Sequence, residues 1–106
     1  MKVIAKHKNE EQGYIEYHLV QVGSWDLFGD LVSFFEQYYD ALVHVKTDGI
    51  HTRKWQIRCR DEYFMFEHNE DVGNWFYSCS DEGDSPLMHE ISEELERRLS
   101  EPTESE

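Results

Sequence analysis

Basic residues are scarce in this sequence. Ten Lys and Arg stand against 23 Asp and Glu, which gives a formal net charge of −13. Nucleic-acid binders and polybasic membrane-binding proteins neutralise phosphates with Lys and Arg, so this balance argues against both classes. Long apolar runs are missing as well, and no segment has the length needed to span a bilayer or the hydrophobic region of a signal peptide. We expect neither a membrane nor nucleic acid as a direct partner.

Cysteine, proline and glycine are also few, at 2, 2 and 6 residues. Two cysteines, Cys59 and Cys79, cannot build a framework of disulfides, and this cysteine usage predicts a cytoplasmic protein with reduced thiols. No Pro- or Gly-rich linker divides the 106 residues, a length that suits one domain. We therefore expect a single domain over residues 1–100 and a disordered acidic tail over residues 101–106.

What the sequence does contain is a regular series of short apolar segments separated by polar turns. Period-two alternation predicts strands over residues 2–8, 14–22, 42–47, 51–60, 63–68 and 75–80. Asp48 and Gly49 form the dipeptide most typical of a two-residue hairpin turn. Because hairpins dominate and no strand–helix–strand unit recurs, we expect a mostly antiparallel sheet of about five to six strands.

Two segments have the apolar spacing of an amphipathic helix. The first is expected from an N-cap at Ser24 to about Asp40, and the second begins with Ser85 as N-cap and Pro86 at the first helical position. The order β-β-α-β-β-β-β-α predicts an α+β two-layer sandwich with both helices on one face of the sheet. The apolar stripe of the first helix is expected at Leu27, Leu31, Phe34, Phe35 and Tyr38, widened by Phe28, Val32 and Tyr39.

Charge is distributed unevenly along the chain. Positions 46–60 carry five basic residues against one acidic residue, whereas positions 81–106 carry ten acidic residues against two arginines. One interpretation is a solvated sheet face whose charges are offset across strands. The other is a bipolar surface that steers a partner of opposite sign. The basic strand consists of Arg53, Lys54, Arg58 and Arg60.

Aromatic residues are abundant, with 3 Trp, 6 Tyr and 6 Phe. Over residues 63–66 and 75–77 both faces of the predicted strands are apolar or aromatic, whereas a sheet covered on one side normally has polar residues on the other. Either protein covers both faces, or one aromatic face is an interaction surface. The candidate interaction surface comprises Asp81, Glu82, Asp84, Glu90, Glu93, Glu94, Trp75 and Phe76.

Motifs for catalysis, cofactors and metals are missing. The six histidines lack metal-ligand spacing, and neither a Gly-rich phosphate loop nor a nucleophile motif is present. Cys59 and Cys79 occupy apolar-facing positions of predicted strands, where thiols act as small hydrophobic groups. We predict no catalytic, cofactor-binding or metal-binding residue, and an enzyme has no motif in its support.

Three segments carry a resemblance to known proteins. Residues 47–55 end in Trp55, residues 63–68 form an aromatic strand that contains Glu67, and residues 74–77 hold Trp75. This arrangement across a β meander resembles small bacterial families of domains of unknown function. The resemblance implies an α+β fold and a bacterial, cytoplasmic setting, and it carries over no functional residue.

These features lead to one main hypothesis, an acidic, non-enzymatic protein-interaction domain. A concrete form is an inhibitor or immunity-type partner of a basic protein such as a nuclease, whose phosphate-binding cleft accepts acidic side chains. Two alternatives stay open: a homodimeric or small-ligand-binding domain without a charge-specific partner, and a phage-encoded nucleic-acid mimic. A net charge that serves solubility alone explains the same composition.

Overall fold

The structure, a computed structural model, describes residues 3–20 and 25–100. Its elements follow the predicted order and confirm the α+β fold. The predicted N-cap at Ser24 and the predicted tail over residues 101–106 lie outside the described residues. The elements are β1 (Ile4–Asn9), β2 (Tyr14–Leu19), α1 (Trp25–Tyr39), β3 (Leu42–Asp48), β4 (Thr52–Cys59), β5 (Glu62–Asn69), β6 (Gly73–Ser78) and α2 (Pro86–Ser100).

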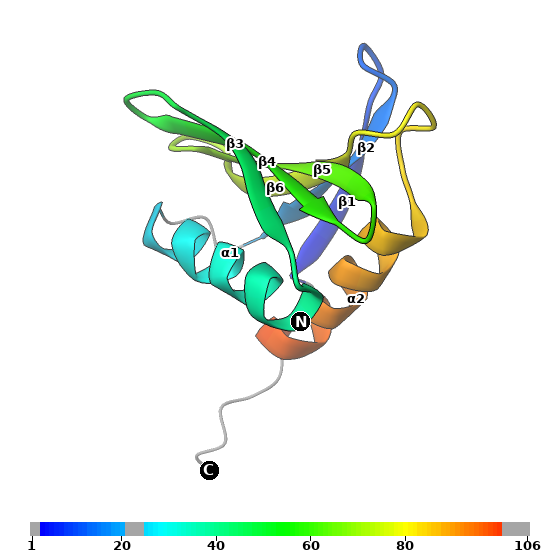
Figure 1. The fold of residues 1–106 in the computed structure, drawn as a ribbon. Helices are drawn as coiled ribbons and strands as arrows, with labels where there is room; N and C mark the ends of the chain where they lie inside the picture. Colours follow the sequence, from blue (N-terminus) through cyan, green and yellow to red (C-terminus); the bar gives the residue numbers. More distant parts are fainter. Residues whose placement is uncertain (1–2, 21–24, 101–106) are drawn as a thin grey trace.

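The six strands form one antiparallel sheet in the order β1-β2-β6-β5-β4-β3 (Figure 1). Four of the neighbouring pairs are hairpins or consecutive strands, and the fifth joins β2 to β6 through the pairs Tyr17–Phe76 and His18–Trp75. This long-range pairing puts β6 next to the first hairpin and leaves β1 and β3 as the two edges. The first and last strands in sequence, β1 and β6, therefore lie on either side of β2.

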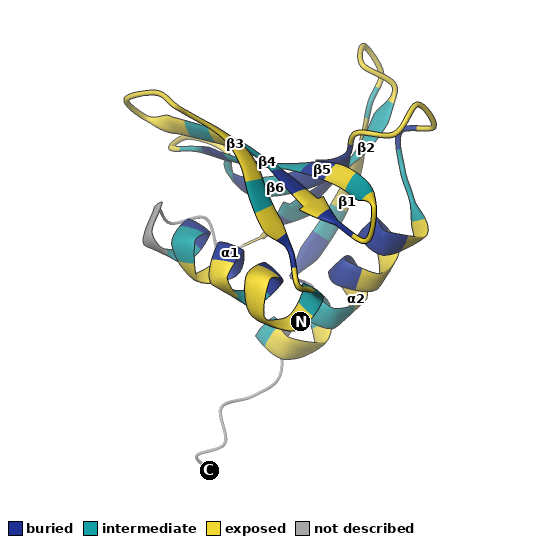
Figure 2. Cartoon of the chain, viewed as in Figure 1, coloured by how far each residue is buried: buried dark blue, intermediate teal, exposed yellow. Residues whose placement is uncertain are grey.

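Both helices lie against the same side of the sheet, so the other side is covered by neither (Figure 1). We call this second side the helix-free face. The buried core fills the space between the helices and the sheet, where the Phe28 ring stacks on Phe66 at 4.3 Å and Phe35 meets Phe64 edge-on at 5.3 Å. The inner strands β5 and β6 are largely buried, whereas β3 is exposed along most of its length (Figure 2).

The buried stripe of α1 agrees with the predicted one except at Tyr38. Phe28, Leu31, Val32 and Phe35 are buried at the spacing of one helix face, whereas Tyr38 is 53% exposed. The Tyr38 ring lies on the outside of the helix with the Arg98 guanidinium 4.4 Å from its centroid. None of the helices among the described residues is long and apolar enough to cross a membrane.

The start of α2 agrees with the predicted capping residues. The helix begins at Pro86, and the Met88 N–H donates to the Ser85 hydroxyl at 3.3 Å, which is the bond expected of an N-cap. Further along, Arg98 pairs with Glu94 at 2.5 Å. Arg97 pairs with the same carboxylate at 2.5 Å.

The two-residue hairpin turn lies at a different place from the predicted one. Asp48 and Gly49 do not form it, because β4 begins only at Thr52 and the loop between the strands has three residues. The two-residue loop is Arg60–Asp61, whose φ angles are 53° and 66°. Positive φ at both central residues matches the right-handed twist of the flanking strands, so Arg60 and Asp61 adopt it although neither is glycine.

Candidate interaction surface

The strand register shows which side chains share the helix-free face. Because side chains alternate along each strand, residues paired across neighbouring strands lie on the same side of the sheet. The face is crossed by one row at Val45, Gln56, Met65 and Tyr77 and by a second at Leu42, Arg58 and Tyr63. Lys54 of β4 and Glu67 of β5, which pair with each other, lie on the same face.

The end of this face formed by β3, β4 and β5 is apolar and exposed. Leu42 is 65% exposed, Val45 47% and Tyr63 36%. Val45 also borders a shallow hollow of about 350 Å³, whose other lining residues are Thr47, Lys54, Gln56 and Met65. Leu42 and Val45 lie in neighbouring rows of β3, and Tyr63 lies in the row of Leu42 with Arg58 between them. Single exposed apolar residues are ordinary, but several on one uncovered sheet face are typical of an interaction surface. We call Leu42, Val45 and Tyr63 the apolar end.

The centre of the face contains an anchored carboxylate. The Tyr77 hydroxyl donates a hydrogen bond to Glu67, and the Tyr14 ring stacks on the Tyr77 ring with centroids 4.0 Å apart and planes at 3°. Burial raises the pKa of Tyr77 well above that of a free tyrosine, and the bond to Glu67 raises it further. Tyr77 thus stays a neutral donor and holds the Glu67 side chain in place on the face.

A second carboxylate lies on β2, with β6 between it and Glu67. Glu16 accepts a hydrogen bond from the Asn9 side chain at 3.1 Å and contacts the His18 ring nitrogen Nε2 at 2.8 Å. The His18 ring in turn stacks on Trp75, with centroids 5.3 Å apart. Trp75, a predicted interaction residue, therefore lies half-buried on the helix-free face beside Glu16 and His18.

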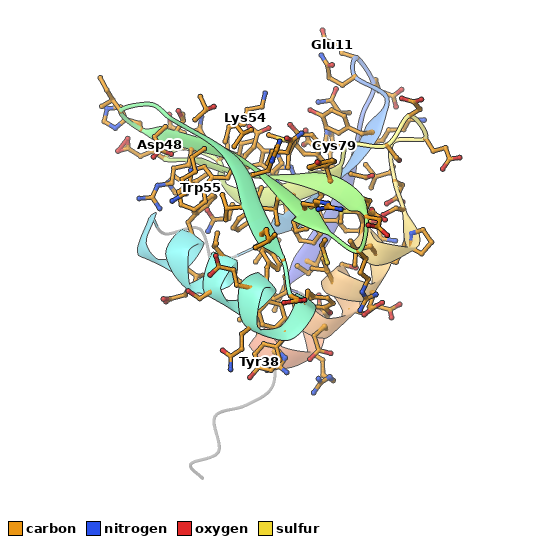
Figure 3. All side chains as sticks on the ribbon, viewed as in Figure 1. Glu11, Tyr38, Asp48, Lys54, Trp55 and Cys79 are labelled. Atoms are coloured by element: carbon orange, nitrogen blue, oxygen red, sulfur yellow. The ribbon has the colours of Figure 1, made fainter. Side chains whose placement is uncertain are left out.

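Two loops meet at the β1–β2 end of the sheet. The Ile15 N–H donates to the Gly83 carbonyl at 2.9 Å, which fixes the segment after β6 against the first hairpin (Figure 1). This contact brings four exposed carboxylates to one corner of the molecule, and Glu11 marks it in Figure 3. Within the described part of the chain none of the four forms an ion pair. We call them the acidic corner: Glu10, Glu11, Asp81 and Glu82.

The remaining predicted acidic residues do not form one surface. Asp84 accepts a hydrogen bond from the Tyr17 hydroxyl at 2.7 Å and pairs with His89 at 2.9 Å, so it holds the loop to the core. Glu90 is neutralised by Arg60, with two contacts at 2.8 and 2.9 Å.

Two further carboxylates of α2 differ from each other. Hydrogen bonds from Arg97 and Arg98 lower the pKa of Glu94, as the bond from Arg60 lowers the pKa of Glu90. Glu93 is exposed on the same helix and forms no ion pair with the described residues. The acidity that the sequence suggested for α2 is thus partly cancelled by its own arginines and by Arg60.

The predicted basic strand and aromatic surface need three corrections. Lys54 and Arg58 lie on the helix-free face, but the Arg53 guanidinium lies on the helix side, 5.3 Å from the Phe28 centroid. Arg60 is outside the strand because the chain turns there. Phe76 is fully buried in the core, since its neighbour Trp75 takes the helix-free face and side chains alternate along β6.

The two cysteines lie in different surroundings. Cys59 is buried as predicted, and its thiol contacts the Tyr39 carbonyl at 3.3 Å. Cys79 is exposed, contrary to the prediction, because β6 ends at Ser78 just before it. Burial raises the pKa of both thiols, so neither is activated as a nucleophile. Over the residues that the structure describes, no group of three or more His, Cys, Asp or Glu is placed to hold a metal ion.

Comparison of the chain with protein-family models, with curated proteins and with solved structures finds no match. No family is assigned on this basis, and function has to be inferred from the geometry of the helix-free face and its charges.

Proposed function

We propose that this chain is an acidic protein-interaction domain that binds a basic protein through its helix-free face. The single observation that carries the proposal is the apolar end, where Leu42, Val45 and Tyr63 are exposed on a sheet face that no described helix covers. Removing such apolar groups from water is a usual source of binding free energy in a protein interface.

The charges of the molecule favour a basic partner. The net charge is −13, and the acidic corner lies beside the same face with four carboxylates that have no ion pair within the described chain. Negative potential of this size accelerates encounter with a basic protein and repels a second acidic copy. Glu16 and Glu67 add carboxylates beside the half-buried rings of Tyr14 and Trp75, a combination that favours Lys and Arg side chains through cation–π and charge-assisted hydrogen bonds.

The inhibitor form of the proposal follows from the same chemistry. A nuclease or another phosphate-binding protein has a cationic cleft, and the acidic corner is a projecting group of carboxylates joined to an apolar docking surface. Steering by charge would then act at the β1–β2 end of the sheet and anchoring by apolar contacts at its β3–β5 end. Lys54 and Arg58 at the apolar end would meet acidic residues at the rim of that cleft.

The test compares two double variants with exposed apolar residues removed. Leu42→Ser with Val45→Ser alters the apolar end, and Ile50→Ser with Val72→Ser alters residues that are 88% and 57% exposed in the hairpin loops. Each immobilised protein is incubated at low salt with extract of the organism's own cells. We expect the unaltered domain to retain one basic protein at 1:1 stoichiometry, the apolar-end variant to lose it, and the loop variant to keep it.

Two results would contradict the proposal. Equal retention by both double variants would remove the apolar end from the interface. A partner that stays bound at high salt with an unchanged association rate would remove the electrostatic part. Light scattering detects a further outcome, the formation of a homodimer. If the unaltered protein has twice the mass of a 12.7 kDa chain and the apolar-end variant has the mass of one chain, the face binds a second copy of the chain.

A further inference from the structure

We propose that the groove between edge strand β1 and helix α2 binds an extended segment of another protein. The segment would add to the sheet as a strand beside β1 and carry acidic side chains next to Lys6 and Lys8. This site lies on the opposite edge of the sheet from the apolar end and does not depend on the function proposed above.

The backbone of β1 leaves hydrogen-bonding groups on its outer edge. The Val20 N–H donates to the Val3 carbonyl at 2.6 Å, so Val3 belongs to a hydrogen-bonded pair of the β1–β2 ladder. Such pairs alternate in an antiparallel ladder, and the N–H and C=O groups of Lys6 and Lys8 therefore point away from β2. Within the described chain nothing bonds to them, and an added strand would satisfy them.

Glu96 marks where this open edge begins. Its carboxylate accepts the Ile4 N–H at 2.8 Å and the Val3 N–H at 2.9 and 3.0 Å. The Ile4 N–H belongs to the same outward series as those of Lys6 and Lys8, so a side chain of α2 already occupies the first position of the edge. An added strand would continue from that point toward Asn9.

A groove runs along the same edge and gives the added strand a floor. It has a volume of about 670 Å³ and lies between residues 4–6 of β1 and Ser92, Glu93 and Arg97 of α2. A strand beside β1 would direct every second side chain onto this surface of α2, as side chains alternate. Backbone bonds to β1 and side-chain contacts with α2 would then act on one bound segment.

The opposite edge of the sheet lacks these properties. The register of β3 shifts between Val43 and Val45, a bulge of the kind that interrupts strand addition. Lys46 and Asp48 of β3 are engaged by Trp55, through a cation–π contact at 4.5 Å and a hydrogen bond of 2.7 Å. In contrast, β1 pairs in continuous register from Ile4 to Asn9.

The charge of β1 indicates the chemistry of the segment. Lys6 and Lys8 are exposed, share one side of the strand and form no ion pair with the described residues. Carboxylates at alternate positions of an added strand would lie next to them. Arg97 lines the groove as well, paired with Glu94 at 2.5 Å, and Glu93 makes the helix side mixed in charge.

The experiment is an NMR titration of the full chain with short blocked peptides. The probe alternates Val and Glu over six residues, and matched peptides replace Glu with Lys or methylate alternate backbone nitrogens. We expect the Val–Glu peptide to shift the amide signals of residues 5–9 and 92–97. It should also slow exchange of the Lys6 and Lys8 amide hydrogens by about tenfold or more. The Lys peptide and the methylated peptide should do neither.

Charge-reversal variants test whether Lys6 and Lys8 select the peptide by charge, and a separate measurement checks that each variant is folded. Lys6→Glu with Lys8→Glu should reverse the preference toward the Lys peptide, while Lys54→Glu on the helix-free face should leave it unchanged. The amide spectrum of each free variant reports whether it is folded. Equal binding of the Glu and Lys peptides, shifts confined to the helix-free face, or no shift at millimolar peptide would overturn the proposal. None of these results bears on the apolar end, whose own variants leave β1 intact.

Discussion

A Cβ atom on Gly83 would overlap the carbonyl oxygen of Gly13 and lie 2.9 Å from the Cα of Tyr14. The backbones of the loop after β6 and of the first hairpin are therefore in direct contact, and only glycine allows it. The Gly83 φ of +79° adds a second requirement for glycine. This contact holds together the two loops that form the acidic corner.

Replacing Gly83 by alanine should lower the free energy of unfolding by about 2 to 4 kcal/mol, since it combines a left-handed backbone with an overlap against backbone atoms. Urea unfolding measures the change. Gly29→Ala is the control, because Gly29 is in α1 and an added Cβ would meet no atom within 4 Å beyond its chain neighbours and the helix's own backbone. It should stabilise the protein by up to about 1 kcal/mol. Similar midpoints for the two variants would contradict the close contact.

Tyr77→Phe removes the hydroxyl that bonds Glu67 and keeps the ring that stacks on Tyr14. We expect a loss of about 1 to 2 kcal/mol of unfolding free energy, because a hydrogen bond to a charged group is broken. Tyr63→Phe is matched to it, since Tyr63 is 36% exposed on the same face, and it should change stability by less than about 0.5 kcal/mol. Chemical unfolding of both variants gives the comparison, and equal effects would count against an anchored Glu67.

Tyrosine ionisation should differ between the folded and unfolded protein. Burial raises the pKa of Tyr14, Tyr17, Tyr39 and Tyr77 above the ordinary value of 10.0. The stabilisation linked to these neutral phenols is complete below pH 10 and is lost as the pH rises above it, because the unfolded chain then releases protons that the folded chain keeps. Phenolate absorbance should continue to rise in the native protein after it has levelled off in urea. Coincident titration curves would contradict this.

A substitution in the loop between β4 and β5 should raise the stability of the protein. Asp61 has a φ of 66°, and its side chain is exposed in a single ion pair with Arg58 at 3.3 Å. Asp61→Gly should therefore raise the unfolding free energy by about 0.5 to 1 kcal/mol, because glycine adopts positive φ without strain. Thermal unfolding monitored by circular dichroism checks the sign. A lower melting temperature would mean that the Arg58 pair or the Asp61 backbone contributes more than the strain costs.

Local chemistry made much of the fold predictable. The start of α2 can be predicted from the capping residue Ser85 and from Pro86 alone, and the strands can be predicted from the alternation of apolar and polar residues along each segment. The strand pattern puts the hairpin between β4 and β5 one residue too late, between residues 60 and 63, because Arg60 and Asp61 lack the glycine signature that would locate the turn. The α1 stripe is wrong only at Tyr38, whose ring is apolar enough to fit a core pattern but packs on the helix surface beside Arg98.

The candidate surface was less predictable because it depends on long-range pairing. Placing β6 beside β2 brings Trp75 to His18, and no local pattern specifies that neighbour. The acidic residues of α2 look like one patch in the sequence, but Arg60 comes from a distant hairpin to neutralise Glu90. The acidic corner needs the contact between Gly13 and Gly83, which only the folded chain reveals.

The most direct test of the central claim is hydroxyl-radical footprinting of the domain, alone and bound to the basic protein that it retains. The account predicts that Tyr63, Met65 and Trp75 on the helix-free face are protected in the complex. Tyr38, which is 53% exposed on the surface of α1, should keep its reactivity. Protection of Tyr38 with unchanged oxidation of Tyr63 would place the partner on the helices and contradict the proposed interface.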